Sequence, residues 1–130
     1  MYASQMYRLH GGQQDTLRAT DLLSVGDTLR MPVIVSGQYN YLRSFVIQAP
    51  TGSFDYWLTC DSTVRAALAG TSKLEEGVMY FKPASAVLVT VNLWFVPRLT
   101  GSQRMTFAIT NDATNQAYSH REFYIDFAVH

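Results

Sequence analysis

The chain has 130 residues, ten basic and ten acidic side chains, and a hydrophobic content of 48%. This length fits a single domain, 1–130, with a core large enough to fold without disulfides or a structural metal. The zero formal net charge argues against nucleic-acid binding, which relies on excess Lys and Arg to neutralise phosphates.

Cys60 is the only cysteine, so no disulfide can form within the chain. The first eight residues lack the basic stretch and apolar run of a secretory signal peptide. The longest apolar stretch, 84–96, is short and interrupted by polar residues, so it cannot span a bilayer. We therefore expect a protein made in the cytoplasm, without a signal peptide and without a membrane partner.

The first half of the chain predicts β-strands after an N-terminal segment, 1–20, that we expect to be an extended arm or irregular. Apolar and polar residues alternate over 28–35, as in a half-buried strand, and Ser24–Asp27 provides the preceding turn. Pro32 has no N–H for a ladder, which suggests an edge position or a bulge. Two further strands are predicted at 41–48 and 54–60, separated by a turn.

One short helix is predicted around 62–69. Asp61 or Ser62 can cap its N-terminus, and Gly70 is suited to end it. A helix of about two turns is not stable alone, so we expect it to pack on a sheet.

The second half is more strongly β. We expect a short strand at 77–82, a long strand at 87–97, and a hairpin turn at 100–102 that leads into the next strand. The last strand alternates Phe123, Ile125, Phe127 and Val129 with polar residues. The sequence thus predicts an all-β protein: an antiparallel β-sandwich or a jelly-roll-like barrel of about seven to eight strands with one short helix.

Side chains that could support catalysis or hold a metal are few and scattered. His10, His120 and His130 have no metal-ligand spacing, and a single cysteine cannot form a zinc site. Glu122 and Asp126 lie on the polar face of a strand, where carboxylates are usually solvated and not an acid–base pair. No phosphate-loop, dinucleotide or nucleophile motif is present. We therefore predict no catalysis, no cofactor and no metal.

Large apolar side chains occupy strand faces that the alternation predicts to be polar. Such a strand needs a cover over its second face, which the helix, the N-terminal segment or another subunit could provide. For Trp57 and Trp94 three alternatives are open: core beneath the helix, a shared oligomer interface, or a sugar-stacking platform. The candidate interface anchors are Trp94, Leu88, Trp57 and Tyr41, with Arg43 and Arg98 as polar partners.

Three hypotheses for function follow. The first is a structural protein that self-associates as a homo-oligomer or docks on a larger assembly, such as a capsid decoration, coat or tail subunit of a virion. The second is a lectin-like module that binds a glycan through exposed Tyr and Trp side chains. The third is a small β-barrel enzyme, which needs a polar cluster that the sequence does not display. We favour the first, because aromatic residues and Arg carry much of the energy of protein interfaces.

Overall fold

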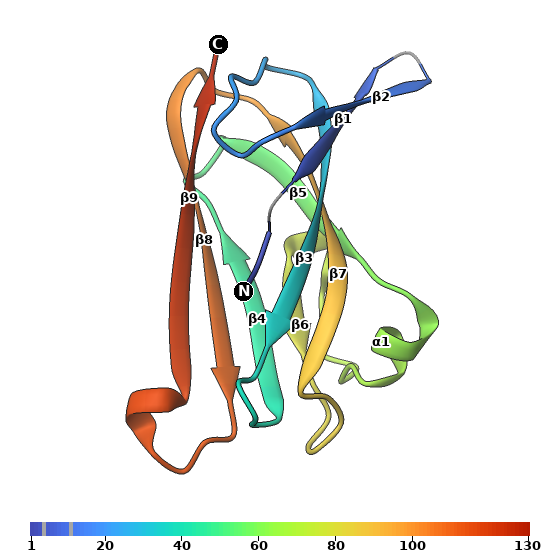
Figure 1. Cartoon of the computed structure of the whole chain (residues 1–130), viewed down its shortest axis with the longest axis vertical. Coiled ribbons are helices and arrows are strands. Elements are labelled where there is room, and N and C mark those ends of the chain that lie inside the picture. The colour runs from blue at the N-terminus through green and yellow to red at the C-terminus, as the bar shows by residue number, and fades with distance from the viewer. Residues whose placement is uncertain (4, 11) are drawn as a thin grey trace.

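Alternating apolar side chains bring the chain into two antiparallel sheets that pack face to face, as the computed structural model shows for residues 1–3, 5–10 and 12–130 (Figure 1). The five-stranded sheet has the order β2 (Gln13–Leu17), β1 (Met6–His10), β3 (Thr28–Ser36), β7 (Leu88–Pro97), β5 (Phe54–Thr59). The four-stranded sheet has the order β6 (Val78–Tyr80), β4 (Leu42–Gln48), β8 (Gly101–Asn111), β9 (His120–Val129). The predicted β-sandwich is confirmed, with nine strands in the described residues and without closure into a barrel.

The core lies between the sheets and is built from the inward residues of every long strand. Phe54 and Phe95 of the five-stranded sheet meet Phe127 of the four-stranded sheet, with ring centres 4.9 to 5.7 Å apart. Edge-to-face and tilted aromatic pairs of this kind add to the free energy of plain burial. This aromatic cluster therefore ties the two sheets together.

The short helix α1 (Ser62–Ala66) closes one side of the sandwich between β5 and β6. The Asp61 side chain caps it by accepting a hydrogen bond from the backbone N–H of Val64 at 2.8 Å. The helix ends earlier than predicted from Gly70, because Leu68 already pairs with Phe81 as an isolated β-bridge. Two one-turn 3₁₀ helices, η1 (Leu74–Glu76) and η2 (Gln116–Tyr118), complete the helical segments of the described chain.

The predicted hairpin at 100–102 is wrong. The turn carries the chain from β7 in one sheet to β8 in the other, so the two strands do not pair. Turn residues predict a reversal of direction but not which strand becomes the neighbour. Pro32 does not mark an edge either, since β3 is an inner strand. Among described residues, pairing on its β1 side stops at Arg30 and resumes at Ile34, on either side of the proline.

Simple alternation along β4 predicts apolar residues on both faces of the strand, but the structure does not have two apolar faces there. The register with β8 shifts between Leu42 and Ser44, which turns both Leu42 and Phe45 into the core. Arg43 is exposed at this shift. An irregular register therefore explains a pattern that simple alternation assigns to burial on both faces.

The N-terminal segment forms a hairpin of β1 and β2 that projects at the same end of the sandwich as the C-terminus (Figure 1). β2 is an edge strand, and four of its five residues are exposed. The opposite end carries the loops that follow β3, β6 and β8 (Figure 1).

Candidate functional site

A row of aromatic and cationic side chains crosses the outer face of the five-stranded sheet. The strand registers set Tyr7 beside Arg30, Arg30 beside Trp94, and Trp94 beside Trp57. The two indole rings stack with an interplanar angle of 4° and centres 6.3 Å apart. The Arg30 guanidinium carbon lies 4.7 Å from the centre of the Tyr7 ring and 6.0 Å from that of Trp94. We call these four residues the aromatic row.

Hydrogen bonds hold the aromatic row in place. The indole N–H of Trp94 donates to the Thr59 hydroxyl at 2.9 Å, and Arg30 donates to the Asn92 side-chain oxygen at 3.2 Å. Both tryptophans are only partly buried, and both lie outside the core cluster between the sheets. The row is therefore a rigid surface feature carried by neighbouring strands.

The rest of this outer face is apolar for its position. Ile34, Leu88 and Tyr2 are exposed there, and Tyr2 pairs with Ile34 in a short bridge beside β3. Along β3, β7 and β5, only Arg30 and Asp55 are charged among the outward residues. Thr90 and Asn92 lie between Leu88 and Trp94 on β7, so the apolar side chains form two patches on this face. Exposed apolar patches often mark interaction sites.

The outer face of the four-stranded sheet carries more charged side chains, and it also exposes Tyr124, whose ring centre lies 3.9 Å from the Arg104 guanidinium carbon. Arg104 binds Asp126 through two hydrogen bonds of 2.7 and 3.0 Å, and His120 lies 3.6 Å from Glu122. Hydrogen bonding to the Arg104 guanidinium holds the pKa of Asp126 below its usual value. Charged pairs across exposed strands are typical of a face that stays in water.

The six candidate residues fall in three places. Trp94, Trp57 and Leu88 share the outer face of the five-stranded sheet. Arg98 is exposed just after β7 and binds Asp55 at 2.7 Å. Arg43 lies in β4 of the other sheet and Tyr41 just before that strand, so they do not join the aromatic row.

Sequence reasoning missed Arg30 and Tyr7 as members of the row. Both sit on the polar parity of their strands, where a single exposed Arg or Tyr attracts no notice. Only the register between strands shows that they continue the line of Trp57 and Trp94.

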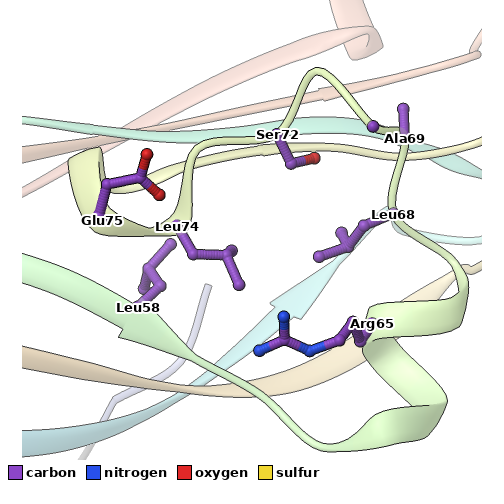
Figure 2. A pocket seen from close by; sticks show the side chains of 8 residues that line it. Leu58, Arg65, Leu68, Ala69, Ser72, Leu74 and Glu75 are labelled. Atoms are coloured by element: carbon purple, nitrogen blue, oxygen red, sulfur yellow. The ribbon is translucent and has the colours of Figure 1, made fainter.

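A separate pocket of about 410 Å³ lies beside α1. Figure 2 shows Leu58, Leu68 and Leu74 gathered there, with the Arg65 side chain extending toward them from the helix. The Ser72 hydroxyl donates to the Tyr80 carbonyl and accepts from the Tyr80 N–H, so it is already used in the fold. Among the described residues that line this pocket, one carboxylate and no histidine are present, so it assembles no acid–base pair.

The described part of the chain holds no group of three or more His, Cys, Asp or Glu side chains that could bind a metal. Its helices are all too short to cross a membrane. No protein-family model matches the chain, and no curated protein matches it significantly.

Proposed function

We propose that this protein is a non-enzymatic assembly module that associates with a second copy of itself through the outer face of its five-stranded sheet. The observation that supports this proposal is the contrast between the two outer faces. The five-stranded sheet presents stacked tryptophans, an arginine beside two aromatic rings, exposed aliphatic side chains and an ion pair at Asp55. The four-stranded sheet presents two ion pairs, with Arg104 also lying over the Tyr124 ring.

The size of the face fits a pair of such molecules. The four strands β1, β3, β7 and β5 hold 30 residues in all. At about 4.8 Å between strands and about 3.3 Å per residue they cover about 480 Å² in projection, and the accessible area is larger because side chains stand out from the sheet. A stable interface buries about 800 Å² per partner, so the face is of the required order.

A second copy is also the partner that the charges favour. The chain carries no formal net charge, so its overall charge does not oppose the association of two copies. Two identical faces meeting about a two-fold axis would bury the aromatic rows against each other, as in most homodimers. Arg30 keeps donors beyond its bond to Asn92 and could use them across the interface.

The other hypotheses receive less support from this surface. Trp94 has Trp57 over one ring face and Arg30 toward the other, so it offers a sugar no free platform. Docking on a larger assembly would use the same sheet face. In the test below, it corresponds to a protein that stays monomeric at every concentration. A place in a virion remains a prediction from composition.

Solution mass tests the proposal. Light scattering after size exclusion, over a hundredfold range of concentration, should show a rise from monomer to dimer. Leu88→Lys should weaken this association about tenfold or more, because it introduces a charge into an apolar contact.

Tyr124→Lys is the matched control. Tyr124 is 61% exposed on the outer face of the four-stranded sheet, against 59% for Leu88, and its replacement should leave the association unchanged. A monomer at every concentration would overturn self-association. An equal weakening of the association in both variants would show that the contact is not specific to the outer face of the five-stranded sheet.

A further inference from the structure

The loop end of the sandwich, opposite the projecting hairpin, is organised around one buried polar side chain. Asn111 donates from its amide to the carbonyls of Gly37 at 3.2 Å and Tyr118 at 2.9 Å, and its side-chain oxygen accepts from the N–H of Ala113 at 2.9 Å. It therefore joins the β3–β4 turn to the β8–β9 loop. Buried and fully bonded, it fixes the relative position of these two segments.

The β3–β4 turn holds two side chains in an unfavourable backbone conformation. Gln38 and Tyr39 have φ of 52° and 69°, a region that residues other than glycine rarely adopt. Tyr39 is fully exposed, so packing of its side chain does not account for this conformation. The Asn40 N–H donates to the Gly37 carbonyl at 3.1 Å, so the two positive φ values are those of a tight type I′ turn.

Between the two segments lies a depression of about 260 Å³. Its lining carries amide, hydroxyl and phenol groups and no charged side chain: Gln38, Asn40, Ala113, Thr114, Asn115 and Tyr118. At about 30 Å³ per water molecule, this space holds about nine water molecules, so it fits a ligand of about one six-membered ring.

Several polar atoms of this lining are available to a ligand. Asn115 uses its side-chain oxygen to accept from Ala117, which leaves its amide N–H groups. Asn40 uses its amide to donate to the Gln38 carbonyl, which leaves its side-chain oxygen. In the described residues, the Gln38 amide and the Thr114 and Tyr118 hydroxyls make no hydrogen bond. Donors and acceptors are therefore mixed around one small space.

We propose that this depression binds an uncharged saccharide ring. Sugar hydroxyls both donate and accept hydrogen bonds, as amides and hydroxyls do, and the exposed Tyr118 ring can pack against the apolar face of a pyranose. A charged ligand would find no opposite charge in this lining. The site lies outside the aromatic row and does not depend on the proposed self-association.

The test is an NMR titration of ¹⁵N-labelled protein with the methyl glycosides of glucose, galactose, mannose and N-acetylglucosamine. At least one should give saturable shifts confined to residues 37–41 and 112–119, with a millimolar dissociation constant, as expected for so small a ligand.

Two variants and one control separate binding from folding. Tyr118→Ala should weaken the binding about tenfold. Gln38→Gly removes an amide but relieves the positive φ, so it should lose binding while the melting temperature stays the same or rises. Tyr124→Ala, an equally exposed tyrosine on the four-stranded sheet, should bind as the unmodified protein does.

Three results would overturn the proposal. The first is the absence of saturable shifts with all four glycosides. The second is binding that survives Tyr118→Ala and Gln38→Gly unchanged. The third is a preference for N-acetylneuraminic acid with shifts centred on 120–122, where Arg121 and Glu122 line an adjoining depression that shares Gln38 and Tyr118 with this one.

Discussion

Replacing Trp94 with alanine separates the two roles that its position gives it, in the monomer and in the assembly. In the monomer the variant loses the hydrogen bond to Thr59, worth about 1 kcal/mol, and the stack with Trp57, worth about 1 kcal/mol. Arg30, at 6.0 Å from the ring centre, adds about 0.5 kcal/mol or less. These interactions sum to about 2 kcal/mol and the partial burial of the indole adds about 1 kcal/mol, so the expected loss is about 3 kcal/mol, or roughly 8 to 13 °C in Tm for a chain of this length.

A core aromatic provides the comparison. Phe95 is fully buried between the sheets, and Phe95→Ala should cost about 3–5 kcal/mol. Both free energies of unfolding are measured by urea titration at concentrations where the protein is monomeric. The dissociation constant of the dimer, measured by sedimentation, should be about thirtyfold or more higher for Trp94→Ala than for the unmodified protein, which is the effect of an interface hot spot. A loss of 4 kcal/mol or more with an unchanged dissociation constant would refute the reasoning and make Trp94 a core residue.

Three other perturbations test the fold and its electrostatics. Asn111→Ala should cost about 3 kcal/mol in urea unfolding, because it removes three hydrogen bonds in a buried place, and a loss below about 1 kcal/mol would contradict its role. Burial raises the pKa of the Cys60 thiol, so iodoacetamide at pH 8 should alkylate the folded protein about tenfold or more slowly than the urea-unfolded chain; equal rates would contradict this. The Arg104 guanidinium lowers the pKa of Asp126, so its contribution to stability is present above the unfolded pKa of about 3.9 and is lost as the pH falls further. The difference in stability between the unmodified protein and Asp126→Asn should therefore be seen at neutral pH and vanish near about pH 2, and a constant difference would argue against the ion pair.

Local sequence patterns were sufficient for most of the fold. Alternation over 28–35 and 123–129 correctly identifies the inward residues of β3 and β9. Asp61 caps the helix as predicted, because a cap depends only on residues within one turn. These features are set by neighbours in sequence, which is why sequence reasoning finds them.

Features that depend on distant residues were not predictable in the same way. The exit of the chain from β7 into the other sheet depends on which strands pair, and turn residues do not encode this. The register shift at Arg43 places Leu42 on the same buried face of β4 as Phe45, against the alternation. Asn111 looks like a turn residue in the sequence, but burial and contacts with Gly37 give it a structural role.

The candidate surface was predictable in part. Apolar bulk on the polar parity singles out Trp57, Trp94 and Leu88, which lie on the outer face of the five-stranded sheet, with only the two tryptophans side by side. The same criterion misplaces Tyr41, because it lies just before β4, a strand of the other sheet. Arg30 escaped notice, since its role comes from the rings on the two adjacent strands.

The most direct measurement of the central claim uses the two tryptophans, the only ones in the chain, since both lie on the proposed interface. Acrylamide quenching of their fluorescence is followed over the same hundredfold concentration range as the solution mass. The account predicts that quenching falls in step with the rise in mass, as each aromatic row becomes covered by its partner. A rise in mass with constant quenching would contradict it and assign the association to another surface.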